Sequence, residues 1–233
     1  MMSPMADATL TGWVYGPVGR ALRSLVQTLL LFPIVRFLTP VTIRGREQLA
    51  RLRGPVIVAA NHVSHLDTPL VLRVLPRAIR RRLVVAAAKD YFYRGRVRGT
   101  LVSLALATYP FDREGGSRAS LARTVGLLEG GWSLLIFPEG TRSPSGEIGR
   151  VRSGVAVLAT QAGVPVLPLC VHGLAAVMPK GTAAPLPGGV VVDVGEPVRP
   201  QPDEEVPAFR DRVEASLRAL AAQAPAWGEP KKG

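Results

Sequence analysis

A histidine and an aspartate five residues apart are the part of the sequence best suited to chemistry. His62 and Asp67 lie in the segment 61–67, directly after the apolar run 56–60. That run predicts a buried strand, and Asp67 with Pro69 is typical of a helix start, so His62 should lie in a strand-to-helix turn. Such a turn can fold the carboxylate back onto the ring, whereas positions five apart on a continuous helix point to different faces. The pair therefore predicts a general base, with Asp67 orienting the imidazole.

Two further segments place an arginine just after an apolar stretch. The segment 137–143 reads Phe-Pro-Glu-Gly-Thr-Arg-Ser and follows the apolar run 134–136, while the segment 109–113 reads Tyr-Pro-Phe-Asp-Arg. Each therefore puts a guanidinium, on Arg142 or Arg113, in a loop at the end of a predicted strand. A guanidinium suits a phosphate because it donates two parallel hydrogen bonds in one plane.

Four blocks in this order resemble the glycerolipid acyltransferases of the lysophosphatidic acid acyltransferase type. They are the N-H-x-x-x-x-D box at 61–67, Phe111–Arg113, the F-P-E-G-T-R-S box at 137–143, and Val164–Pro168. Four such blocks in the right order are a specific signal. The resemblance covers roughly residues 41–195. It departs from the family pattern at Tyr109-Pro110, where relatives have a Gly and a β-branched residue.

The resemblance implies transfer of a fatty acyl group from acyl-CoA or acyl carrier protein to the free hydroxyl of a lysophospholipid. Lysophosphatidic acid, giving phosphatidic acid, is the simplest acceptor. No cofactor beyond the acyl donor is expected. Glycerol 3-phosphate, another lysophospholipid or an amino-lipid remains an alternative acceptor, and a non-catalytic membrane-binding relative is a further alternative. The second alternative is disfavoured by the intact catalytic and binding residues, namely His62, Asp67, Glu139 and Arg142.

The same chemistry follows from the residues themselves. An acyl thioester is already an activated electrophile, and a thiolate whose pKa is about 8.5 leaves without obligatory protonation. What the reaction still needs is a nucleophile. His62 activates the acceptor hydroxyl by removing its proton, which raises the reaction rate roughly 10²- to 10⁴-fold. Backbone N–H groups that stabilise the oxyanion are expected either from the turn 139–141 or from the turn after Ala60.

The substrate-binding residues are expected in the same loops. Arg142 is the first choice for the acceptor phosphate and Arg113 the second. The resemblance adds Lys89, which matches a basic position that reaches the phosphate in relatives. Glu139 is expected either to bind acceptor hydroxyls or to hold Arg142. The predicted set is completed by Gly140 and Thr141.

Three other kinds of site fit the sequence less well. His62, His65 and Asp67 are enough donors for an open zinc site, but the family box leaves the His65 position free, so no metal is expected. Cys170 and His172 lie two apart, yet apolar neighbours would raise the thiol pKa, which predicts a buried core cysteine. None of the serines lies in a G-x-S-x-G elbow, which argues against a serine esterase.

The first forty residues predict a membrane-contacting helical element. The apolar stretch 25–35 is bracketed by Arg23 and Arg36 and interrupted by Gln27 and Pro33. A bilayer span needs about 20 predominantly apolar residues, so we expect a helix pair that lies in the interface rather than crossing it. A helix buried against the core is the alternative. The residues expected at the headgroup layer are Trp13, Tyr15, Arg20, Arg23 and Arg36.

Composition agrees with a membrane-surface protein. The net charge of +12 predicts an anionic partner, and the basic clusters 77–82 and 94–98 suit anionic lipids or a substrate phosphate, with a solvated surface as the alternative. Aromatic residues make up only 6% of the chain and zinc-finger spacing is missing, so nucleic acid is not expected. The N-terminal residues lack the basic region with which a secretory signal peptide begins, so a cleaved signal is not expected. A single cysteine forms no internal disulfide. We therefore expect a peripheral or monotopic protein on the cytoplasmic side of the membrane.

Past residue 40 the sequence alternates between strand and helix patterns. This predicts an α/β fold with a mixed, mostly parallel β-sheet flanked by helices. The expected strands are 41–43, 56–60, 83–87, 107–111, 134–137, 166–171 and 190–194. Helices are expected over 117–129 and through Phe209 to Leu220, the latter capped by Asp203. The expected organisation is an anchor over 1–40, a catalytic domain over 41–223 and a flexible tail over 224–233.

Overall fold

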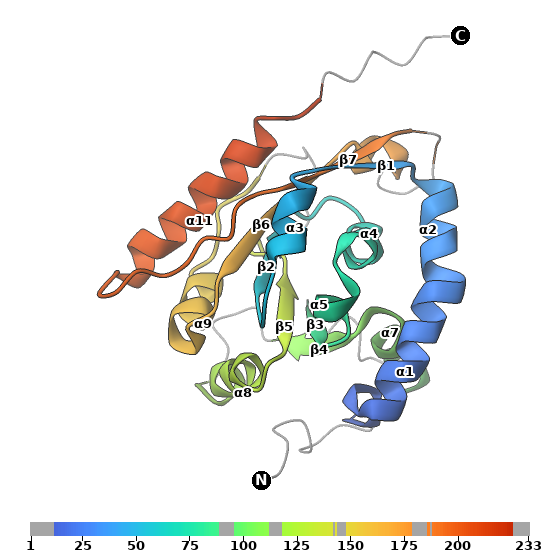
Figure 1. The fold of residues 1–233 in the computed structure, drawn as a ribbon, viewed down its shortest axis with the longest axis horizontal. Helices are drawn as coiled ribbons and strands as arrows, with labels where there is room; N and C mark the ends of the chain where they lie inside the picture. The colour runs from blue at the N-terminus through green and yellow to red at the C-terminus, as the bar shows by residue number, and fades with distance from the viewer. Residues whose placement is uncertain are drawn as a thin grey trace.

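Short apolar runs build one seven-stranded sheet in this computed structural model (Figure 1). The structure describes residues 12–88, 96–111, 118–141, 143, 148–178, 186 and 188–225. The strands are β1 (Val41–Arg44), β2 (Ile57–Ala60), β3 (Leu83–Ala88), β4 (Thr108–Phe111), β5 (Ser133–Ile136), β6 (Val166–His172) and β7 (Val190–Val194). Each expected strand is confirmed to within one residue at either end.

The sheet order places distant segments of the chain next to one another. The order is β1-β7-β6-β2-β5-β3-β4, and every neighbouring pair is parallel except β6 with β7. The expectation of a mixed, mostly parallel sheet is therefore confirmed. Because β2, β5, β3 and β4 run in one direction, the loops that follow them begin on the same edge of the sheet.

Helices cover both faces of the sheet (Figure 1). On one face lie α8 (Arg118–Glu129), α9 (Gly154–Ala162) and α11 (Val206–Ala221). The other side carries α3 (Arg46–Arg51), α4 (Asp67–Val74), α5 (Arg77–Arg80), α7 (Arg96–Leu106) and α10 (Leu174–Val177). This arrangement leaves the central strands without contact with water, which is why they are continuously apolar rather than alternating.

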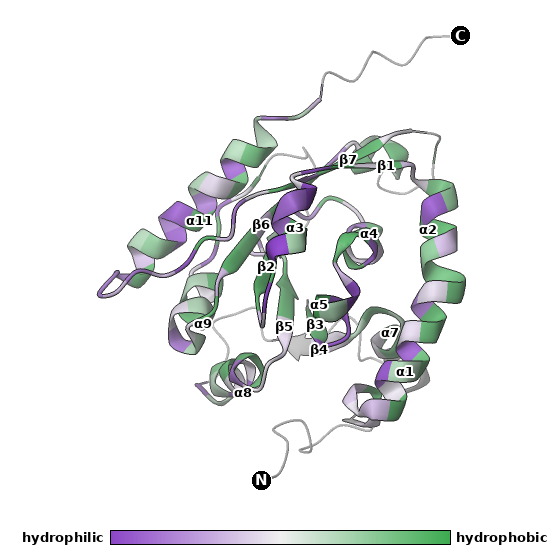
Figure 2. Cartoon of the chain, viewed as in Figure 1, coloured by the Kyte–Doolittle hydropathy of each residue, from purple (hydrophilic) through white to green (hydrophobic). Residues whose placement is uncertain are grey.

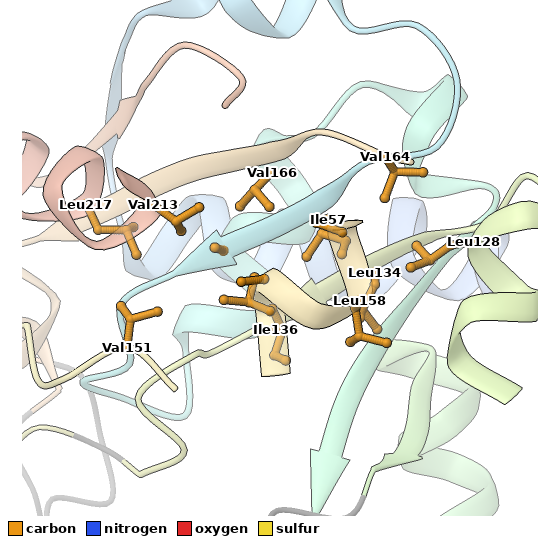
Figure 3. Packing of buried hydrophobic residues seen from close by; sticks show 14 of the residues in the cluster. Ile57, Leu128, Leu134, Ile136, Val151, Leu158, Val164, Val166, Val213 and Leu217 are labelled. Atoms are coloured by element: carbon orange, nitrogen blue, oxygen red, sulfur yellow. The ribbon is translucent and has the colours of Figure 1, made fainter. Parts of the chain in front are cut away.

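Alternate residues of each central strand fill two separate cores. Ile57 of β2 packs with Leu134 and Leu158 under α9 and α11 (Figure 3), whereas Val58 points to the opposite core with Leu70 of α4. A strand side-chain period of two produces this division. Burial of these apolar side chains contributes about 25 cal/mol per Å² of surface removed from water, and it anchors the helices on both faces.

The closing helix α11 packs through Phe209, Val213 and Leu217, as its helical spacing predicts. Its start differs from the expectation. Asp203 was expected to cap the helix, but the helix begins at Val206 after Glu205, and Asp203 instead has a positive φ of 58°. An aspartate tolerates the left-handed region better than most residues, so Asp203 belongs to the preceding turn.

The N-terminal element is one continuous helical segment, not the expected helix pair. Helix α1 (Pro17–Val26) passes through the π-turn Gln27–Leu31 into α2 (Phe32–Leu38). A proline in an uninterrupted α-helix collides with the carbonyl four residues earlier, and the wider π-turn accommodates its ring. By length and composition alone, the 22 residues Pro17–Leu38 would suffice to cross a membrane.

This segment has one face packed on the protein and another exposed. Tyr15 and Arg23 were expected at the headgroup layer, but both are buried: the Tyr15 hydroxyl donates to the Thr108 carbonyl, and Arg23 is only 2% exposed. Gln27 Nε2 donates to the Ala105 carbonyl at 2.9 Å, which ties the π-turn to α7. The exposed apolar face consists of Val18, Leu22, Leu25, Leu29, Leu30, Ile34 and Phe37. Figure 2 colours the apolar residues along α1 and α2 green.

The two kinds of apolar position predict different responses to the same substitution. We expect Leu70→Ala to lower the free energy of unfolding by about 2–5 kcal/mol, because Leu70 is fully buried between α4 and the sheet. Leu29→Ala removes the same atoms from a side chain that is 63% exposed, so it should change stability by less than about 0.5 kcal/mol. Urea unfolding followed by circular dichroism measures both, and equal losses would contradict the assigned burial.

Candidate active site

The pairing of β2 with β5 brings the two most distinctive sequence boxes together. Ala59 of β2 lies opposite Ile136 of β5 in a parallel register. The chain therefore leaves both strands at the same edge, at Asn61 and at Phe137. The catalytic box and the F-P-E-G-T-R-S box are separated by about 70 residues in sequence but begin side by side in space.

The His62–Asp67 pair forms as the sequence predicted. His62 Nδ1 lies 2.8 Å from Asp67 Oδ2, and Asp67 is fully buried as the first residue of α4. The same oxygen accepts the backbone N–H groups of Val63 at 2.7 Å and Ser64 at 2.8 Å. Three donors on one oxygen fix the carboxylate, which in turn fixes the ring.

The imidazole of His62 is held on its flat side as well as at its edge. Its ring stacks on Phe137, with 4.2 Å between the ring centroids and an interplanar angle of 19°. The side chain keeps 21% of its surface exposed. Since Nδ1 is engaged by Asp67, the neutral tautomer that donates to the carboxylate leaves Nε2 as the proton acceptor.

Glu139 holds the backbone of His62. Glu139 is buried, and its Oε1 accepts the His62 N–H at 3.0 Å while its Oε2 accepts the Gly149 N–H at 2.8 Å. On the other side of the same residue, the Ser143 N–H donates to the His62 carbonyl at 2.8 Å. The F-P-E-G-T-R-S loop thus grips both polar groups of the His62 backbone. Sequence reasoning missed this contact because it links positions far apart in the chain.

Gly140 is required by its backbone and by its neighbour. Its φ of 77° lies in the left-handed region, and a Cβ placed on it would come within 2.7 Å of Arg152 Nε. Arg152 therefore lies against the turn, and its N–H bonds the Pro138 carbonyl at 3.0 Å. No local pattern distinguishes Arg152 from the other 24 arginines of the chain. Thr141 follows on the exposed side of this turn.

The turn after Ala60 does not offer its first N–H groups to an oxyanion, contrary to one of the two expectations. The N–H of His62 is taken by Glu139, and those of Val63 and Ser64 are taken by Asp67. In the other turn, the Gly140 N–H bonds the Phe137 carbonyl at 3.1 Å. These amides serve to hold the site's own carboxylates and turn in place.

Asn61 is a further residue of the site whose role sequence reasoning missed. Its Nδ2 donates to the Val171 carbonyl at 3.0 Å, and its Oδ1 accepts the Val171 N–H at 2.8 Å. The buried amide thereby continues the hydrogen-bonding pattern between β2 and β6 by one position after β2 has ended. It anchors the start of the catalytic turn to the sheet.

Three of the predicted substrate-binding residues, Lys89, Arg113 and Arg142, lie outside the described residues. The strands that precede the first two, β3 and β4, end on the same edge of the sheet as β2. Among the described residues, no group of three or more His, Cys, Asp and Glu side chains is placed to hold a metal ion.

Cys170 and the second histidine–carboxylate pair are parts of the core. Burial raises the pKa of the Cys170 thiol to about 12, as expected for a core cysteine rather than a nucleophile. His172 Nε2 lies 3.0 Å from Asp193 Oδ2, but this buried carboxylate also pairs with Arg44 through Oδ1 at 2.5 Å. The three side chains tie β6, β7 and β1 together.

Comparison with known proteins agrees with this geometry. The chain is 30% identical over 159 residues to the chloroplastic 1-acyl-sn-glycerol-3-phosphate acyltransferase BAT2 of Brassica napus, covering 67% of this chain and 44% of that protein. It is 31% identical over 168 residues to the human 1-acyl-sn-glycerol-3-phosphate acyltransferase alpha, covering 70% of this chain and 57% of that protein. The chain thus spans about half the length of the curated relatives it matches.

Its fold is similar to the crystal structure of the 1-acyl-sn-glycerophosphate (LPA) acyltransferase PlsC from Thermotoga maritima. The TM-score is 0.67 at 24% sequence identity, over 93% of this chain and 92% of that chain. The model of the protein family described as Acyltransferase matches residues 40–172, which include β2, the catalytic turn and the F-P-E-G-T-R-S loop. The chain belongs to this acyltransferase family.

Proposed function

We propose that the protein transfers a fatty acyl group from a thioester, acyl-CoA or acyl carrier protein, to the free hydroxyl of lysophosphatidic acid. The product is phosphatidic acid. The observation that carries the proposal is the His62–Asp67 pair at 2.8 Å, seated beside the F-P-E-G-T-R-S loop. The names of the relatives support the acceptor, since those proteins are 1-acyl-sn-glycerol-3-phosphate acyltransferases.

In the proposed reaction, His62 Nε2 accepts the proton of the acceptor hydroxyl as its oxygen attacks the thioester carbonyl. The tetrahedral intermediate collapses with cleavage of the C–S bond. An ester and a thiolate are formed, and the thiolate takes up the proton from the imidazolium. Asp67 stabilises the imidazolium while it carries this proton and keeps Nε2 directed away from the carboxylate.

Glu139 is proposed to position His62 rather than to contact the substrate. Both of its oxygens already accept backbone N–H groups, from His62 and from Gly149. A displaced His62 backbone would move the ring relative to the bound hydroxyl, and misplacement by about 1 Å costs on the order of 10²-fold in rate.

The acceptor phosphate is proposed to bind arginine and lysine side chains that follow three neighbouring strands. Arg142 follows β5, Arg113 follows β4 and Lys89 follows β3. Because these parallel strands all end on the edge where His62 lies, the cationic residues that follow them in sequence are our candidates for holding a phosphate whose glycerol hydroxyl meets Nε2.

The exposed apolar face of α1 and α2 is proposed to dock the enzyme on the cytoplasmic surface of a membrane. Phe37 is 86% exposed and Leu29 63%, which is unusual for large apolar side chains on a surface in water. Lysophosphatidic acid and its product are membrane lipids, so an enzyme seated on the bilayer meets its acceptor there. The segment is assigned to the interface because its opposite face packs on α4 and α7.

The first test separates the two histidines of the catalytic box. We expect His62→Ala to lower acyl transfer by roughly 10²- to 10⁴-fold with no loss of folded structure, since only the general base is removed. His65→Ala should retain most of the activity, because His65 is exposed and it is His62 whose ring nitrogen lies 2.8 Å from Asp67 Oδ2. Thiol release from acyl-CoA in the presence of lysophosphatidic acid measures both. Equal losses, reversed by added zinc, would favour a metal site instead.

The second test distinguishes positioning from substrate binding at Glu139. Glu139→Gln keeps the shape of the side chain but places its NH2 group against a backbone N–H, so one hydrogen bond is lost. We expect kcat to fall about 10-fold or more while KM for lysophosphatidic acid changes little. Slow hydrolysis of the thioester by water should fall in parallel, since it also needs His62. Glu214→Gln is the matched control, because Glu214 accepts the Val151 N–H at 3.0 Å without contacting His62. A rise in KM alone would assign Glu139 to the substrate.

The third test concerns the acceptor phosphate. Arg142→Lys keeps the charge but loses the planar pair of donors, and each charge-assisted bond lost is worth about 1.5–3 kcal/mol. We therefore expect kcat/KM for lysophosphatidic acid to fall at least about tenfold. Hydrolysis of the thioester by water needs no phosphate contact and should change much less. If both rates fell equally, Arg142 would be structural, and the phosphate would be held by Arg113 and Lys89.

A further inference from the structure

The outer side of α2, α4 and α5 carries arginines without carboxylates in the nearby sequence. Residues 8–46 contain five arginines and no Asp or Glu, and residues 68–88 likewise contain five arginines and no Asp or Glu. These two stretches meet where α2 packs on α4. Positive charge therefore accumulates at one helix–helix contact instead of being balanced locally, as surface charges commonly are.

Arg36 of α2 and Arg73 of α4 lie at the centre of this charge. The pKa of Arg73 is lowered, first by burial of its guanidinium and second by the nearby charge of Arg36. Arg73 Nη1 is buried and has no hydrogen-bond partner within the part of the chain that the structure describes. A buried N–H donor next to a second cation is unfavourable unless an anion accepts from it.

Arg80 of α5 differs from Arg73 because the protein supplies contacts to its guanidinium. Its Nη1 donates to the carbonyls of Leu72 at 3.2 Å and Leu75 at 3.0 Å, and its guanidinium lies over the Phe32 ring at 4.6 Å. Arg80 thus caps the C-terminal end of α4 and links it to α2. The contrast singles out Arg36 and Arg73, because the structure gives Arg80 a structural role that these two do not have.

The arginine pair borders the exposed apolar face. Arg36 is exposed and is followed directly by Phe37, while Ile34 and Leu30 lie one and two turns before Phe37, respectively, on the same side of the helix. An anion that reaches Arg36 therefore meets apolar side chains on one flank and two guanidinium groups on the other. A phospholipid has this combination of a phosphate and acyl chains.

We propose that Arg36 and Arg73 bind the phosphate of an anionic phospholipid of the bilayer, with the exposed face of α2 in contact with its acyl chains. The proposal rests on the membrane contact proposed above and adds a specific lipid site to it. Arg73 lies six residues after Asp67 on α4, about 9 Å along the helix axis at 1.5 Å per residue. The site is therefore distinct from the catalytic turn but attached to the same helix.

The experiment compares flotation of the full chain with vesicles of phosphatidylcholine alone and of phosphatidylcholine with phosphatidic acid. The variants are Arg36→Gln, Arg73→Gln and the two combined. The matched control replaces Arg118 and Arg123, two exposed arginines of α8 on the opposite face of the sheet, by Gln. It makes the same change in net charge as the combined variant.

We expect each single variant to lower binding to the anionic vesicles about fivefold, with neutral vesicles unaffected. The combined variant should lose little more than either single one, because one phosphate needs both guanidinium groups. The proposal is wrong if the variants keep their full preference for anionic vesicles, or if the α8 control loses as much binding as they do. Either result would assign the binding to positive charge spread over the surface.

Two further measurements distinguish failure of this lipid site from failure of the membrane contact or of the His62 site. Binding to neutral vesicles reports the apolar face alone, so its absence in the unmodified protein would count against the membrane contact and, with it, this lipid site. Thioester hydrolysis in detergent reports the His62 site and should be unchanged in the variants. If Arg73→Gln lowers stability, the exposed Arg36→Gln variant alone decides the outcome, because its loss of anionic preference is required by the proposal.

Discussion

The central position of β2 is the constraint on which the site depends. Its neighbours are β5 on one side and β6 on the other, both parallel to it. The strand ends at Ala60, and the next residue, Asn61, bonds β6 while His62 is held by the loop after β5. The catalytic turn is therefore attached to three strands at once. A turn so attached has few conformations left to it, which is the condition for holding a base within a fraction of an ångström.

Carboxylates and amides within the site mainly bind one another. Asp67 takes two backbone N–H groups besides the ring of His62, and Glu139 takes two more. Each bond satisfies a buried polar group that would otherwise cost about 1–3 kcal/mol. Residues that resemble substrate ligands in the sequence thus serve to build the site. In the proposed function, the substrate is therefore contacted by the ring of His62 and by cationic side chains that follow the strands in sequence.

Features that depend on local sequence were predictable, and features that depend on distant contacts were not. The strands follow from apolar runs, and the His62–Asp67 contact follows from a turn five residues long. The bond from Glu139 to the His62 N–H, by contrast, exists only because β2 and β5 are neighbours. The burial of Arg23 likewise depends on which face of α1 meets α7, and Tyr15 is buried with its hydroxyl bonded to Thr108 of β4, far along the chain. A single residue such as Asp203 has only a weak preference for capping a helix, and here it adopts the positive φ of the preceding turn instead.

Among residues 8–88, all basic side chains other than His62 and His65 are arginines. Guanidinium groups keep their charge throughout the range in which proteins remain folded, unlike imidazole. The lipid contact proposed above would therefore keep its positive charge over a wide range of pH.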